Sequence, residues 1–204
     1  MRSADSHSRV DAILCDVGDV LILWDKEIPA AIERAYGLPD GSVLFEILKS
    51  HAGKLATIGR VTHEEWLREV TCRLPDAAVR EWLSYHGDLN SDLISLLAAA
   101  RQAGVRVYLL TNATSRLWED LAYHGIRDFA DRVYCSASIG LAKPDPKLYR
   151  QVVRAIFVPP ERVLYIEDTP SWADAGRQIG MVSHTYSGIP ALKDELKRLG
   201  LPVC

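Results

Sequence analysis

Short apolar segments alternate with helix-like stretches along most of this chain, and no other feature of the sequence constrains the fold as strongly. Each apolar segment ends in polar residues, and helix-like stretches end at glycines such as Gly104, Gly125 and Gly180. Strands are predicted over residues 10–15, 105–110, 132–135, 163–166 and 182–186, with helices over 93–100, 115–124, 145–156 and 170–179. This alternation predicts an α/β fold with a parallel, doubly wound sheet.

One part of the chain, residues 26 to 88, breaks the alternation because it holds helix signals and no convincing strand. A capping-box pattern at Thr62, for example, marks the start of a helix. At 204 residues the chain is long for one domain and short for two, which favours one core with an insertion. We therefore predict an α/β core domain of residues 1–24 and 89–204 and a helical cap domain of residues 25–88.

The composition narrows the choice of partners and compartment. A net charge of −3 gives no basic excess for nucleic acid or an anionic membrane. No apolar run approaches the ~18 residues of a membrane span, and residues 1–9 show no export signal. The four cysteines form no CxxC pair and are predicted to be reduced thiols: Cys15, Cys72, Cys135 and Cys204. We expect a cytoplasmic protein that binds neither nucleic acid nor membrane, and the oligomeric state stays open.

Polar residues directly after the predicted strands are the candidates for a functional site, because ligands of open α/β sheets bind beyond the carboxyl ends of the strands. Four places supply them: Asp16, the pair Thr111 and Asn112, Lys143 in the loop before the 145–156 helix, and the pair Glu167 and Asp168. A carboxylate can attack phosphorus to form an aspartyl phosphate, so Asp16 is the candidate nucleophile.

An acidic pair beside an anionic reaction centre makes sense mainly if a cation is bound. Mg²⁺ takes oxygen ligands and keeps several of its waters. Asp16, a backbone carbonyl near Gly18 and one or both of Glu167 and Asp168 would be a sufficient protein contribution.

The remaining candidates would contact the phosphoryl group. Lys143 would neutralise the nucleophile and the phosphoryl oxygens, and the Thr111 hydroxyl would donate a hydrogen bond to them. Asn112 would either bind substrate or hold its own loop through an Asx turn.

Four segments in this order resemble the four motifs of the haloacid dehalogenase superfamily of hydrolases: residues 16–21 (DVGDVL), 109–112 (LLTN), 140–145 (GLAKPD) and 166–168 (IED). The resemblance covers nearly the whole chain and implies a Rossmann-like core. The helical insertion after the first motif is similar to the branch with an α-helical cap, which includes phosphatases and dehalogenases. The resemblance as a whole implies a Mg²⁺-dependent phosphatase that hydrolyses small organic phosphomonoesters through an aspartyl phosphate.

The sequence departs from the family pattern at two positions. Phosphatases of the family usually carry a general acid where this chain has Gly18, although some members with glycine there are still regarded as phosphatases. Asp19 follows at an expected turn, so its carboxylate should point elsewhere. Trp172 stands where the family often has Asn or Asp. Two alternatives therefore stay open: a metal-independent 2-haloacid dehalogenase, whose halide leaves without a proton, and a binding or regulatory module with weakened catalysis.

Overall fold

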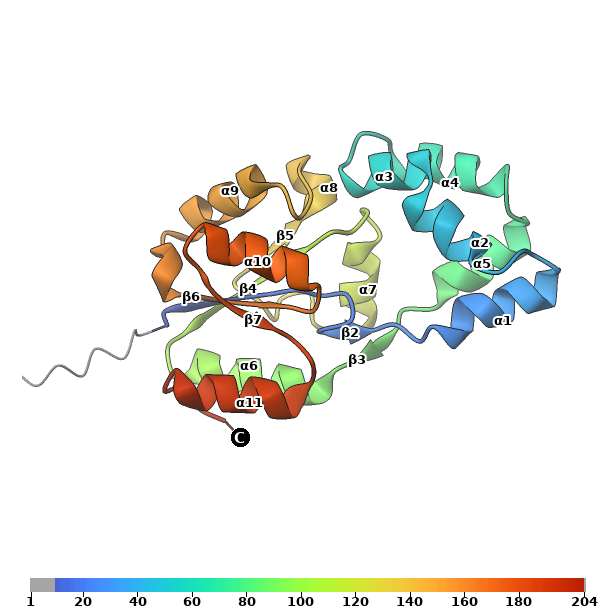
Figure 1. Ribbon diagram of the computed structural model, residues 1–204. Coiled ribbons are helices and arrows are strands. Elements are labelled where there is room, and N and C mark those ends of the chain that lie inside the picture. The colour runs from blue at the N-terminus through green and yellow to red at the C-terminus, as the bar shows by residue number, and fades with distance from the viewer. Residues whose placement is uncertain (1–9, 204) are drawn as a thin grey trace, which may run out of the picture.

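The computed structural model describes residues 10–203 and forms an α/β core with a group of helices beside it (Figure 1). Five parallel strands form one sheet in the order β5-β4-β1-β6-β7. They are β1 (Ala12–Cys15), β4 (Arg106–Thr111), β5 (Arg132–Cys135), β6 (Val163–Glu167) and β7 (Val182–Thr185). All five lie at the predicted positions to within two residues at either end, and the predicted parallel sheet is confirmed.

Helices cover both faces of the sheet, which confirms that it is doubly wound (Figure 1). One face carries α6 (Ser91–Gln102), α7 (Leu117–Tyr123) and α11 (Ile189–Arg198), and the other carries α9 (Pro146–Ile156) and α10 (Pro170–Gln178). A short helix α8 (Ser136–Ile139) follows β5, and a 3₁₀ turn η2 (Pro160–Arg162) precedes β6. Alternate residues of β1 pack into the two clusters, which is why its sequence is apolar throughout.

Several elements escaped the sequence prediction. In the core these include α11, α8 and η2. The two-residue strands β2 (Ile22–Leu23) and β3 (Asp88–Leu89), which pair antiparallel, also escaped it. Strands this short carry no alternation that could be recognised, and β3 begins within the segment where no strand was predicted. β2 lies where the chain leaves the core for the inserted helices, and β3 lies where it returns, so their pairing holds these two connections together.

The inserted helices, called the cap below, are α1 (Glu27–Tyr36), α2 (Ser42–Leu44), α3 (His51–Thr57), α4 (His63–Thr71), α5 (Asp76–Ser84) and the π-helical turn η1 (Phe45–Lys49). They pack around a hydrophobic cluster of their own that includes the buried Trp66 and Trp82. The capping box predicted at Thr62 is present, with Glu65 as its second member. The domain boundaries after residues 24 and 88 stay a prediction.

Side-chain hydrogen bonds fasten the cap to the core in two places. The guanidinium of Arg116, which lies just before α7, donates to the carbonyl oxygens of Leu83 at 2.9 Å and Tyr85 at 2.6 Å. Where α3 ends beside α8, the Ser136 hydroxyl donates to the carbonyl oxygen of Thr57 at 2.6 Å. The cap is therefore held against the carboxyl-terminal side of the sheet (Figure 1).

The structure bears on the predictions about the cysteines and about membrane-spanning segments. Cys15, Cys72 and Cys135 carry free thiols, as predicted, whereas Cys204 and the segment 1–9 lie outside the described residues. Within residues 10–203, every helix is too short or too polar to cross a membrane.

Candidate active site

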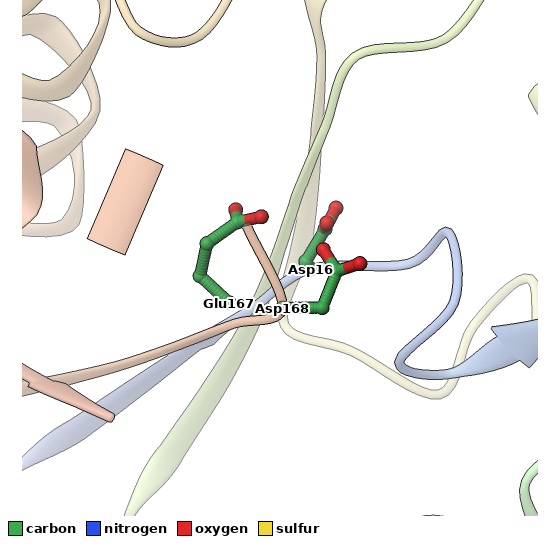
Figure 2. Close-up of side chains that lie close together, drawn as sticks. All are labelled: Asp16, Glu167 and Asp168. Carbon is green, nitrogen blue, oxygen red and sulfur yellow. The ribbon is translucent and has the colours of Figure 1, made fainter. Parts of the chain in front are cut away.

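The predicted site residues come together at the carboxyl ends of three neighbouring strands. Asp16 follows β1, Thr111 ends β4 and Glu167 ends β6, with Asp168 directly after it. Because β1 lies between β4 and β6, their final residues meet at one edge of the sheet. Figure 2 shows the carboxylates of Asp16, Glu167 and Asp168 gathered there.

The ammonium group of Lys143 is the centre of this arrangement. Its Nζ lies 2.8 Å from Oδ1 of Asp16 and 2.7 Å from Oε2 of Glu167, and all three side chains are buried. Burying a charge costs several kcal/mol unless a partner compensates it, so each of these groups depends on the others. The predicted proximity of Lys143 to Asp16 is present in the structure.

Asn112 holds the backbone of Lys143. Its Oδ1 accepts from the Lys143 amide at 2.8 Å, and its Nδ2 donates to the Lys143 carbonyl oxygen at 2.9 Å. The side chain therefore fastens a loop 31 residues away, an arrangement that differs from the Asx turn predicted as one alternative. Because both ends of the amide are engaged, its geometry favours a positioning role, and substrate binding by Asn112 stays a prediction.

Glu167 is fully buried, and both of its oxygens have partners. Oε2 accepts from Lys143 and from the Tyr165 hydroxyl, while Oε1 accepts from the Thr169 amide at 3.1 Å. This environment favours Glu167 as a residue that orients Lys143, and its predicted role as a metal ligand stays a prediction. The sequence reading missed Tyr165, although the period of two along a strand puts it on the same face as Glu167.

Trp172 lies against the other side of the lysine. The centroid of its ring is 4.7 Å from Nζ of Lys143, within the range of a cation–π interaction. Its position in the first turn of α10, four residues after Asp168, brings it to the site. Where the family often has a polar residue, this chain thus supplies an aromatic face to the same lysine.

Asp16 is oriented through one oxygen. Oδ1 accepts from the Val17 amide at 2.7 Å as well as from Lys143, and Oδ2 has no hydrogen bond from residues 10–203. Burial raises the pKa of Asp16, and the adjacent Lys143 ammonium acts in the opposite direction. One oxygen is therefore fixed and the other is available for chemistry.

The carboxylate cluster has the composition of a hard-cation site. One oxygen from each of Asp16, Glu167 and Asp168 lies within 4.8 Å of the others (Figure 2). Burial raises the pKa of all three, and the neighbouring negative charge of Asp16 raises that of Glu167 further. Three carboxylates face one ammonium, so a divalent cation with oxygen ligands fits the uncompensated charge. The Gly18 carbonyl accepts no hydrogen bond from the described residues and is a further available oxygen.

The backbone at Gly18 does not require a glycine. Its φ lies outside the left-handed region, and a Cβ there would first meet Nε1 of Trp24 at an ordinary 3.9 Å. Asp19 is the residue with left-handed backbone, at φ 56°, and its Oδ1 accepts from the Trp24 amide at 3.2 Å. The Asp19 carboxylate thus stabilises the loop, and that it points away from the site stays a prediction.

A comparison with known families identifies the chain. Residues 10–180 match the haloacid dehalogenase-like hydrolase family. The chain belongs to this family. The match confirms the family resemblance, and the structure has the α/β core expected of that family.

Similar sequences include enzymes with different names. The chain is 27% identical over 201 residues to drimenol cyclase drtB of Aspergillus calidoustus, covering 93% of this chain but 35% of that protein. It is 34% identical over 107 residues to phosphatase MT3486 of Mycobacterium tuberculosis, covering 50% and 48%. Sesquiterpene phosphatase astK of Aspergillus oryzae is 25% identical over 194 residues, covering 92% and 95%. The chain therefore spans less than two thirds of the first two relatives.

Solved structures share the fold. A HAD family enzyme of Bacteroides thetaiotaomicron, in complex with magnesium and inorganic phosphate, superposes with a TM-score of 0.75 at 20% identity, covering 88% of this chain and 96% of that one. The L-2-haloacid dehalogenase RSc1362 gives a TM-score of 0.65 at 18% identity, covering 86% of both. At these identities, both structural similarities establish the fold alone.

Replacing Lys143 with Met removes the cation that compensates Asp16 and Glu167. We expect Lys143→Met to lower the free energy of unfolding by about 3–5 kcal/mol at about pH 8, in the presence of a chelator. Without the ammonium, burial keeps both folded-state pKa values raised, so the folded variant binds more protons than the unfolded chain. Its stability deficit should therefore shrink as the pH falls to about 5.

Urea unfolding at the two pH values measures this difference. The exposed Lys147→Met is the matched control and should change stability by no more than about 0.5 kcal/mol. An equal deficit for Lys143→Met at both pH values would contradict the buried ion-pair account.

Proposed function

We propose that the protein is a Mg²⁺-dependent phosphatase that hydrolyses small organic phosphomonoesters through an aspartyl phosphate on Asp16. The observation that carries this proposal is the buried contact of Asp16 with Lys143, next to the acidic side chain of Asp168. A carboxylate fixed on one oxygen is a suitable nucleophile for phosphorus, and an adjacent cation offsets the repulsion between two anions.

The reaction would proceed in two displacements. Oδ2 of Asp16 attacks phosphorus, the bond to the ester oxygen breaks, and the alcohol leaves with a proton that it takes from solvent or substrate. Water then attacks phosphorus of the aspartyl phosphate and gives up a proton to solvent, which releases inorganic phosphate and restores the Asp16 carboxylate. Lys143 and the Thr111 hydroxyl stabilise the phosphoryl oxygens in both steps.

Asp16, Asp168 and the Gly18 carbonyl would hold the Mg²⁺, with Glu167 as a further ligand or as the residue that orients Lys143. When bound, the ion would neutralise phosphoryl charge. Two of the three relatives compared above are named as phosphatases, and the bacterial enzyme of similar fold was crystallised with magnesium and phosphate. These names support a phosphatase, and the small phosphorylated substrate and the cofactor remain part of the proposal.

The dehalogenase alternative fits the site less well. A halide leaves without a proton, so Gly18 would be tolerated, but a metal-free site would leave the acidic residues in repulsion around one lysine. The binding-module alternative predicts no turnover of either substrate class. Release of phosphate from an aryl phosphate and of chloride from 2-chloropropionate separates the three possibilities.

Replacing the nucleophile tests the proposal directly. Asp16→Asn should reduce turnover of p-nitrophenyl phosphate with Mg²⁺ by about a thousandfold or more, because an amide does not attack phosphorus. Asp174→Asn, an exposed acid on α10 outside the cluster, should retain full activity. A folded Asp16→Asn protein with substantial activity would exclude Asp16 as the attacking group.

The metal can be tested without turnover. Saturating Mg²⁺ should raise the melting temperature of the unaltered protein, because a ligand bound at 100 times its Kd stabilises the folded state by about 2.7 kcal/mol. Asp168→Asn should abolish this rise, and Asp174→Asn should keep it. An undiminished rise in Asp168→Asn would move the metal away from this cluster.

Gly18 makes a separate prediction about proton transfer. Without an acid at this position, the rate should fall steeply from aryl to alkyl phosphates as the leaving-group pKa rises. The space at Gly18 admits a side chain, so Gly18→Asp should fold and should flatten this dependence, and Gly18→Asn should fold without flattening it. A shallow dependence already present in the unaltered protein would show that another group supplies the proton.

A further inference from the structure

A cavity of about 290 Å³ opens between the cap and the strand ends. Its floor includes Val17 and Gly18, which directly follow the proposed nucleophile Asp16, together with Thr111 at the end of β4 and Asn112 after it. A group esterified to a phosphate at Asp16 would therefore extend into this space. The volume is close to the lower end of ordinary ligand pockets, about 300 Å³.

The cap side of the cavity is mainly apolar. Its apolar lining residues there include Trp24, Leu44, Ile47, Leu48, Trp66 and Trp82, and the exposed, charged Asp25 and Lys26 also line it. The Trp66 indole N–H is engaged, because it donates to the Ile47 carbonyl oxygen at 3.0 Å. The Trp24 ring stacks on Trp82 with their centroids 5.9 Å apart. These residues therefore present mainly carbon surface to a ligand.

Most of the polar capacity of Arg116 and Asp120 in the lining is taken up by protein partners, although Nε of Arg116 has no partner among the described residues. Arg116 donates to two carbonyl oxygens of the cap and pairs with Asp120 at 3.3 Å. Asp120 also contacts Nδ1 of His86 at 2.8 Å. A sugar or nucleoside has many hydroxyl or amide groups, and burying each without a partner costs about 1–3 kcal/mol. The cavity is poorly suited to such a ligand and well suited to a hydrocarbon.

We propose that the substrate is the phosphomonoester of an apolar alcohol, with its hydrocarbon part bound in this cavity. This inference rests on the proposed phosphatase function and names its substrate class. Phosphate binds at Lys143 and Thr111, and the hydrocarbon contacts the tryptophans and the aliphatic residues of η1. Sugar phosphates and nucleotides lack the apolar surface that this contact requires.

A homologous series of n-alkyl phosphates measures the contact. Each buried methylene contributes about 0.8 kcal/mol, so KM should fall about three- to fourfold per methylene from ethyl to hexyl phosphate, until the cavity is filled. Because the chain is bound equally in the ground and transition states, kcat should change little. Glycerol phosphate should have a KM no lower than that of ethyl phosphate.

Two exposed apolar residues of η1 provide a matched pair of variants. Leu48 lines the cavity and is 46% exposed, whereas Phe45 is 52% exposed and lies outside it. Leu48→Gln should lower the ratio of kcat/KM for octyl over ethyl phosphate by about tenfold. Phe45→Gln should leave the ratio unchanged. Equal ratios in the unaltered protein and both variants would overturn the inference.

Binding of the product separates this inference from the phosphatase proposal. 1-Octanol should change the tryptophan fluorescence of Asp16→Asn, because Trp24, Trp66 and Trp82 line the cavity, and Leu48→Gln in that background should weaken the binding. Hydrolysis of aryl phosphate without any dependence on chain length or octanol binding would overturn the apolar substrate alone. Octanol binding without turnover of any phosphate would overturn the phosphatase, and with it the substrate assignment.

Discussion

The buried ammonium of Lys143 joins three chain segments that are distant in the sequence. It pairs with Asp16 after β1 and with Glu167 at the end of β6, and its backbone is held by Asn112 after β4. These contacts require the order β4-β1-β6, since only neighbouring strands bring their ends within reach of one side chain. Removing any member leaves another buried charge or amide without its partner, so the sheet order and the site depend on each other.

The core and the cap contribute different kinds of interaction to the site. The core supplies the charges, and the cap, together with Trp24 just before it, supplies the tryptophans and aliphatic side chains that line the adjacent cavity. An apolar cover lowers the local dielectric and therefore strengthens the attraction between Lys143 and a phosphoryl group. The Arg116 guanidinium, which also borders the cavity, fastens the cap to the core. Chemistry and choice of substrate can consequently vary separately in this architecture.

The sheet was predictable because each central strand is buried on both faces and ends in polar residues, as at Asp16 and Glu167. The role of Asn112 was not predictable, because its partner Lys143 lies 31 residues away and only the tertiary structure brings the two together. Tyr165 could have been recognised from its spacing of two residues before Glu167. The cavity could not have been recognised from the sequence. The packing of the cap helices decides which apolar side chains face the core and which, like Phe45, face solvent.

The lack of a general acid at Gly18 and the apolar cavity together determine how the proposed reaction could be efficient. An aliphatic alcohol is a poor leaving group, so without a neighbouring acid the cleavage of its phosphate ester limits the rate. Contacts with a hydrocarbon far from phosphorus act equally on the bound substrate and the transition state, and therefore lower KM rather than raise kcat. On the proposed function, the protein would gain catalytic efficiency through tight binding at low substrate concentration. A side chain added at position 18 would first approach Nε1 of Trp24, a residue that also lines the apolar cavity.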